Sequence, residues 1–165
     1  ACKTAGEPVR ALEAYRNMLT AGIRPNLFTC NTLISIFAQQ GKWQKALQLF
    51  ELMFKTGLEP DLVTYNILIN GCRKGSQWGK ALGLFEEMQD IGLKPNVYTY
   101  TTLFAALAKG GQVAKSQELF QSMKADNIWN LPSIVYTALI NAHAKEGEWE
   151  LALQVSQYMA VDGES

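Results

Sequence analysis

The 165-residue chain is poor in the residues that build metal and catalytic sites. It holds three cysteines and one histidine, and no two cysteines form a CxxC pair. Together with His143 they lack the spacing of a zinc site, so we expect no metal and no other cofactor. Cys2, Cys30 and Cys72 are expected to be buried thiols of a protein from a reducing compartment. His143 has no cysteine or carboxylate at catalytic spacing, and we expect it on the surface or in a groove.

Long apolar runs and an excess of charge are missing as well. No apolar run approaches the roughly 20 residues of a membrane-spanning helix, so we expect no membrane partner. The 15 basic and 15 acidic residues give a formal net charge of zero, and bulk basicity therefore does not point to nucleic acid. An apolar share of 48% is nevertheless too high for a disordered chain. No signal or transit peptide opens the sequence, so we expect any targeting segment to lie outside it.

What the sequence does contain is a repeat with a period of 35 residues. Residues 60–74 read PDLVTYNILINGCRK, residues 25–39 read PNLFTCNTLISIFAQ, and residues 95–109 read PNVYTYTTLFAALAK. Glycine, proline and methionine recur at the same step, until the phase slips by one residue near 128–132. A period of this length is typical of helical units that stack on their neighbours.

Each unit is predicted to form two helices. Val63, Leu68 and Cys72 recur at helical spacing after a Pro-Asp pair, and this first helix is expected to end with Gly75 as its C-cap. The second helix is expected to end at Gly92, because Pro95 follows and cannot continue it. A single hairpin cannot bury its apolar face alone. The fold class is therefore predicted to be all-α, an α-solenoid of stacked helix-turn-helix hairpins with a 35-residue period.

The repeat phase also divides the chain. Three complete units are predicted, and a partial unit stands at each end. The predicted ranges are 1–26 for the C-terminal part of a truncated repeat, 27–61 and 62–96 for regular repeats, 97–132 for a repeat with a one-residue insertion, and 133–165 for a repeat truncated at its end. Small residues in the second helices are expected where helices cross closely, namely Ala46, Ala81, Ser116 and Ala152.

A column of polar residues inside the first helices is the strongest sign of a binding surface. Asn31, Asn66, Thr101 and Thr137 recur one turn inside the first helices, where Asn and Thr are middling to poor helix formers. Packing of a core does not explain such a column, so we interpret it as one wall of a groove. Residues just before the helices, such as Asp61, are explained equally well as N-caps.

The motif VTYNILI near the start of a unit and the GL-P-D pattern at its end resemble the pentatricopeptide repeat family, of the pure 35-residue type. The resemblance covers essentially the whole chain. It implies binding of single-stranded RNA, about one base per repeat, read by the fifth and thirty-fifth residues of each unit. It further implies a chloroplast or mitochondrial location and a role in stabilisation, processing or translation of transcripts.

The resemblance assigns roles residue by residue. The predicted base-reading pairs are Asn31 with Asp61, Asn66 with Asn96, and Thr101 with Leu131 or Pro132, whereas Thr137 and Asn26 stand alone. By analogy the first pair favours U, the second a pyrimidine, and threonine a purine, with the repeats running N to C along RNA 5′ to 3′. Leu131 and Pro132 have no polar side chain, so discrimination by the third unit is expected to be weak.

Two further columns have alternative interpretations. The second positions hold Phe28, Val63, Tyr98 and Ile134, which the family would use to stack on bases and which could instead pack at a helix start. The thirteenth positions hold Lys74, Lys109 and Lys145, which would contact phosphates or simply favour a helix C-terminus. The first unit has Gln39 in that column.

We therefore expect a non-enzymatic, sequence-selective segment that binds single-stranded RNA. The alternative is an α-solenoid scaffold for protein–protein contacts or for a ribosome, with other proteins of an organellar complex as partners. A third possibility is an enzyme domain elsewhere in a longer protein. A deaminase would need His-x-Glu with Pro-Cys-x-x-Cys, and neither motif occurs in this chain.

Overall fold

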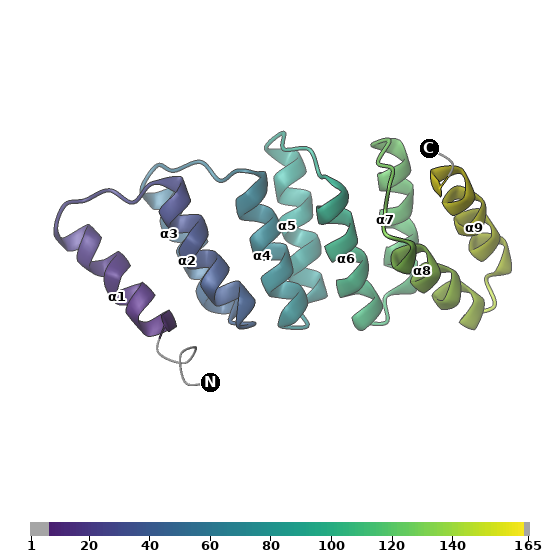
Figure 1. Ribbon diagram of the computed structural model, residues 1–165, viewed down its shortest axis with the longest axis horizontal. Helices are drawn as coiled ribbons and strands as arrows, with labels where there is room; N and C mark the ends of the chain where they lie inside the picture. Colours follow the sequence, from purple (N-terminus) through teal and green to yellow (C-terminus); the bar gives the residue numbers. More distant parts are fainter. Residues whose placement is uncertain (1–6, 164–165) are drawn as a thin grey trace. The chain divides into compact units, whose positions relative to one another are not determined.

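The computed structural model describes residues 7–163, and every regular element in that part of the chain is a helix (Figure 1). The helices alternate in the order that the repeat predicts, with a first and a second helix in each 35-residue repeat. Their bounds are α1 (Glu7–Thr20), α2 (Leu27–Gln39), α3 (Trp43–Lys55), α4 (Leu62–Lys74), α5 (Trp78–Asp90), α6 (Val97–Lys109), α7 (Val113–Ala125), α8 (Ser133–Lys145) and α9 (Trp149–Gly163).

The helices form two compact units, which divide between Lys94 and Pro95. In the first unit α2 packs on α3 and α4, α4 packs on α5, and α1 contacts α2. In the second unit α6 packs on α7, and α8 contacts α6, α7 and α9. Each unit thus consists of helical hairpins that bury an apolar face against their neighbours, as the sequence pattern predicts.

The helix starts follow from the residues that precede them. Asn26, Asp61 and Asn96 are the N-caps of α2, α4 and α6, and each side chain accepts a hydrogen bond from the backbone N–H three residues later. These bonds satisfy amide groups that the first helical turn leaves without a partner. Trp43, Trp78 and Trp149 are the first residues of α3, α5 and α9.

The core is built from the repeated apolar columns. The four small residues of the second helices are buried, which permits the close helix contacts expected there. Cys30 and Cys72 are buried free thiols, and burial raises the pKa of Cys72 to about 11 even though Lys80 lowers it. Cys2 lies outside the described residues.

The expectation for His143 is wrong. His143 is fully buried, not in a groove or on the surface, and its Nδ1 lies 2.8 Å from Glu148 Oε2. Its place in the repeat explains this, because it stands in the column of Cys72 and Leu107, which are buried too. Gly75 is the C-cap of α4, as expected, with a negative φ of −79°, and the left-handed conformation follows at Ser76 (φ 58°).

Two glycines permit close packing where the end of α4 meets the preceding hairpin of α2 and α3. A Cβ on Gly75 would lie 2.1 Å from Trp43 Cδ1, so the indole occupies the space that a side chain would need. A Cβ on Gly71 would lie 3.0 Å from the Cβ of Ala38. These glycines therefore serve packing between neighbouring hairpins, which the local sequence does not reveal.

The connection between α7 and α8 is irregular. It spans residues 126–132, one residue longer than the connections at 56–61 and 91–96. Asn127 and Asn130 both have a positive φ, of 53° and 66°. The ring of Trp129 stacks on that of Tyr158, with centroids 4.8 Å apart and planes 7° from parallel. The extra residue is thus accommodated in an ordered turn.

No helix in the described range 7–163 is both long and apolar enough to cross a bilayer. The same range contains no group of three or more histidine, cysteine, aspartate or glutamate side chains placed to hold a metal ion.

Candidate functional site

A groove between α2 and α4 brings four of the predicted site residues together. The groove encloses about 610 Å³ and is lined by both first helices of the first unit. Phe28 and Val63 line it as apolar groups, and Asn31 and Asp61 line it as polar groups. The fifth and thirty-fifth positions of the unit 27–61 therefore face one space, between two apolar side chains.

The polar groups of this groove form a connected network. The amide nitrogen of Asn31 donates to Asp61 Oδ1 at 3.4 Å, and the hydroxyl of Thr64 donates to Asn31 Oδ1 at 2.7 Å. Asp61 Oδ1 also accepts the backbone N–H of Thr64 at 3.0 Å. The cap of α4 and the side chain inside α2 are thus held by one set of hydrogen bonds.

The network sets the charge of the groove. Partial burial would raise the pKa of the Asp61 carboxyl, but hydrogen bonds from Thr64 and Asn31 outweigh it and hold the pKa below its ordinary value. The carboxyl is therefore ionised near neutral pH. It places an acceptor with a negative charge beside the amide of Asn31.

Replacing Asp61 with asparagine should make the chain's stability less dependent on pH. Because the folded pKa is lowered, the carboxylate stabilises the fold above the unfolded pKa of about 4 and this contribution is lost as pH falls through the folded pKa. The gap in unfolding free energy between wild type and D61N should therefore shrink between pH 6 and pH 3 in urea titrations. Asn96 caps α6 with the same geometry, so the cap itself should survive. A gap that stays constant with pH would contradict this prediction.

The second-position residues are exposed. The exposed fractions are 79% for Phe28, 55% for Val63, 50% for Tyr98 and 75% for Ile134. Packing at a helix start, the alternative interpretation, would bury these side chains. Four large apolar groups in one column that face solvent instead offer surface for a planar ligand.

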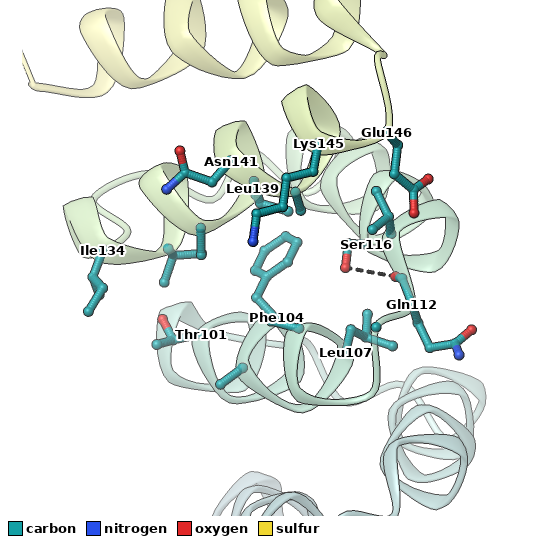
Figure 2. Close-up of a pocket in the computed structure, with 17 residues that line it drawn as sticks. Thr101, Phe104, Leu107, Gln112, Ser116, Ile134, Leu139, Asn141, Lys145 and Glu146 are labelled. Atoms are coloured by element: carbon teal, nitrogen blue, oxygen red, sulfur yellow. Dashed lines mark hydrogen bonds between the residues drawn. The ribbon is translucent and has the colours of Figure 1, made fainter.

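The second unit has a groove of a different character, between α6 and α8 (Figure 2). It encloses about 530 Å³ and is lined by three predicted site residues, Thr101, Ile134 and Lys145. Most of its other lining is apolar, including Phe104 and Leu139. In Figure 2 the ring of Phe104 and the chain of Lys145 point into the space between the two helices.

The hydroxyls of the predicted threonine readers are already engaged. Thr101 donates to the carbonyl of Val97 at 2.8 Å, and Thr137 donates to that of Ser133 at 2.9 Å. Threonine can offer one donor and two acceptor sites. Each hydroxyl donates its proton to a carbonyl of its own helix. Only its acceptor sites are therefore open to a ligand.

The last two residues of the repeat 97–132, Leu131 and Pro132, offer no polar side chain that could contact a base. The side chain of Leu131 is buried, and Pro132 is the N-cap residue of α8 without a side-chain hydrogen bond. The buried carboxylate of Asp162 accepts the backbone N–H groups of Asn130 at 2.6 Å and Leu131 at 3.2 Å. These two hydrogen bonds to Asp162 hold the irregular turn in place.

Of the remaining predicted base-reading residues, Asn26 and Asn96 are N-caps and Asn66 lies inside α4. Asn66 is buried in α4 of the first unit, whereas Asn96 is the exposed cap of α6 in the second unit. Asn26 is the exposed cap of α2 and accepts from Thr29. Capping explains Asn26 and Asn96 at least as well as base reading does.

The three lysines of the thirteenth column are exposed at the last residues of α4, α6 and α8. Lys74 Nζ donates to the carbonyl of Gln39, its counterpart in the preceding unit, at 3.1 Å. This bond favours the helix-end interpretation for Lys74 in the absence of a ligand. It also keeps the ammonium beside the groove, which Gln39 lines.

Sequence reasoning missed Thr64, which joins the cap to the amide of Asn31. A signal was present, because Thr29, Thr64 and Thr99 recur at a step of 35, and Val135 follows after 36. Thr64 and Thr99 are fully buried, and both complete a capping box with the residue three before them.

Sequence models of a known repeat family match most of the chain. Sequence models described as PPR repeat family match residues 25–74 and 72–109, and those described as PPR repeat match residues 98–128 and 134–163. No curated protein sequence matches the chain.

Solved structures resemble the chain over most of its length. The pentatricopeptide repeat protein PPR10 from maize is 28% identical with a TM-score of 0.78, over 92% of this chain and 22% of PPR10. PPR10 in complex with an 18-nt psaJ RNA element matches over the same shares, at 28% identity, with a TM-score of 0.69. The chain thus spans about a fifth of the length of PPR10.

A third structure shares the fold. The PPR domain of Arabidopsis thaliana protein-only RNase P 1, in complex with tRNA, is 15% identical with a TM-score of 0.82, over 94% of this chain and 82% of that one. These likenesses confirm the predicted all-α solenoid of stacked helix-turn-helix hairpins. Because the repeat models together match most of the residues from 25 to 163, the chain belongs to the pentatricopeptide repeat family.

Proposed function

We propose that this chain is a non-enzymatic segment that binds single-stranded RNA sequence-selectively, about one base per repeat. The observation that carries the proposal is the groove between α2 and α4, where Asn31 and Asp61 meet between the apolar side chains of Phe28 and Val63. A base could stack on the apolar groups while its edge meets the amide and the carboxylate.

The family supports this use of the groove. PPR10, which is 28% identical to this chain, has been crystallised with an 18-nt RNA element. We extend RNA binding to this chain, with a role in stabilisation, processing or translation of organellar transcripts. The chloroplast or the mitochondrion is the proposed location, and other proteins of an organellar complex are the proposed further partners.

The two units are proposed to contribute unequally. The groove of the first unit offers a donor and a charged acceptor, whereas that of the second unit is lined mostly by apolar groups. We therefore assign base selection mainly to the first unit. The second unit would add apolar contact surface and, through Lys109 and Lys145, phosphate contacts.

Binding to two RNA pools tests the proposal. One pool carries U, a pyrimidine and two purines in 5′ to 3′ order, and the other exchanges pyrimidines with purines. At fixed salt the wild-type chain should bind the first pool more tightly, by about tenfold for each well-read base. An N66T variant should shift the preference at the second base toward purine.

A matched control makes the same substitution elsewhere. Asn17 is exposed on α1, outside either groove, so N17T should bind both pools as the wild type does. Equal, weak binding of both pools by the wild type, N66T and N17T would contradict the proposal. That result would favour a scaffold for proteins or structured RNA.

A further inference from the structure

The third residue of one repeat completes the polar site of the repeat before it. Thr64 belongs to α4, yet its buried hydroxyl donates to Oδ1 of Asn31 in α2 at 2.7 Å. The hydroxyl oxygen of Thr64 also lies 2.9 Å from Asp61 Oδ1, and it accepts the backbone N–H of Asp61 at 3.2 Å. The hydroxyl therefore contacts both predicted readers of the unit 27–61.

These contacts fix which way the Asn31 amide points. Its nitrogen lies 3.4 Å from the carboxylate oxygen of Asp61, and its oxygen faces the hydroxyl of Thr64. A flipped amide would set two oxygens of Asn31 and Asp61 against each other, which is unfavourable beside an ionised carboxylate. It would also lose the acceptor that the Thr64 hydroxyl uses.

The fixed network leaves two groups of opposite kind toward the groove. The amide nitrogen of Asn31 has a second N–H, and the hydrogen bonds of Asp61 within residues 7–163 go to Oδ1 and the backbone, not to Oδ2. The site thus presents one donor and one acceptor in a set order. Uracil has an acceptor (O4) beside a donor (N3–H), whereas cytosine has a donor (N4–H) beside an acceptor (N3).

We propose that Thr64 is a specificity-determining positioning residue, which holds the Asn31 amide in the orientation that accepts uracil and rejects cytosine. The inference rests on the proposed RNA binding and adds a residue from the following repeat to the site. If stacking on Phe28 and Val63 holds an RNA base in one orientation, the edge of the base faces the Asn31 donor and the Asp61 acceptor in one fixed order. Without the Thr64 hydroxyl, the amide would lose one of the two contacts that set its orientation, and the preference for one order of donor and acceptor would weaken.

The second unit shows a site without this device. Val135 stands in the Thr64 column at the start of α8, and Pro132 replaces the polar cap. Val135 lines the groove between α6 and α8, where Thr101 donates to its own helix. Where the threonine is absent, the groove is mostly apolar and has no ordered pair from a cap and a fifth residue.

Three variants of the 165-residue chain test the inference. T64V keeps the shape of the side chain but removes the hydroxyl, and T64S keeps the hydroxyl. T29V is the matched control, because the Thr29 hydroxyl also contacts the cap residue of its helix, donating to Asn26 Oδ1 at 2.8 Å, and within residues 7–163 it has no hydrogen bond with a fifth-position amide. Each protein is titrated with two RNAs that differ only by U or C at the base assigned to residues 27–61.

The measured quantity is the ratio of the dissociation constants for the C and U oligonucleotides. We expect T64V to lower this ratio about fivefold, the effect of losing one hydrogen bond, while T64S and T29V keep it. A T64V protein that keeps the wild-type ratio overturns the inference and leaves RNA binding intact. A wild-type protein without any U preference overturns the proposed base reading instead.

A second readout needs no RNA. The side-chain amide protons of Asn31, assigned in NMR spectra by comparison with N31D, should exchange with solvent about fivefold faster in T64V than in wild type or T29V. Unchanged exchange in T64V would show that Thr64 does not hold the amide, whatever the chain binds.

Discussion

Replacing Asp162 with alanine should destabilise the second unit by about 3–5 kcal/mol, because each donor left without its acceptor costs about 1–3 kcal/mol where it stays buried. The buried carboxylate accepts the N–H groups of Asn130 and Leu131 and the hydroxyl of Tyr136. Burial and this carboxylate both raise the pKa of Tyr136, so its hydroxyl remains a donor at neutral pH. Alanine would leave these donors without their acceptor, at the turn that positions α8. Urea unfolding followed by circular dichroism measures the loss.

Asp126 provides the matched control for this prediction. It stands 36 residues earlier in the same column and accepts the hydroxyl of Tyr100, but its side chain is exposed. D126A should therefore cost only about 1 kcal/mol, since water can replace the lost acceptor. Equal losses in D162A and D126A would show that burial of the Asp162 network does not stabilise the irregular turn.

The second large effect is expected at Gly75, where alanine should cost about 2 kcal/mol through overpacking. Its φ of −79° is open to any residue, so backbone strain contributes nothing. The added Cβ would meet Trp43 at 2.1 Å from Cδ1 and 2.8 Å from Nε1, both atoms of a rigid ring. The indole would have to leave its place between α3 and the end of α4. Unfolding free energy measured in urea reports the cost.

Gly83 isolates the packing effect from helix propensity. It lies in the middle of α5, and nothing would come within 4 Å of an added Cβ. G83A should therefore stabilise the chain by about 0.5–1 kcal/mol, because alanine favours a helix over glycine. Adding Trp43→Leu to G75A should recover part of the loss. A G75A protein as stable as wild type would mean that the Trp43 ring is not held against residue 75.

The helices could be predicted because their signals are local. Proline or a polar cap residue stands just before each of the helices α2, α4, α6 and α8. Gly75 was predicted to be a cap for a local reason, whereas its importance comes from Trp43, a residue of the preceding hairpin. Spatial neighbours of this kind follow from the stacking of hairpins and not from the sequence around a residue.

The candidate site was predictable only in part. A polar column with Asn31 could be recognised from the residues alone, but its pairing with Asp61 came from the family resemblance. The role of Thr64 depends on a hydrogen bond between two helices, and the donor use of Thr101 depends on a rotamer. His143 could have been placed correctly, because the repeat aligns it with the buried Cys72.

The hydrogen bond between Thr64 and Asn31 has a consequence for recombining such repeats. A junction placed after residue 61, at the end of the 35-residue period, would separate Asn31 and Asp61 from the hydroxyl that holds them. A cassette that begins at Leu27 and ends beyond Thr64 would carry the whole network with it. The unit of exchange for an engineered array is therefore longer than the unit of sequence repetition, and adjacent cassettes must overlap in the first turn of the following helix.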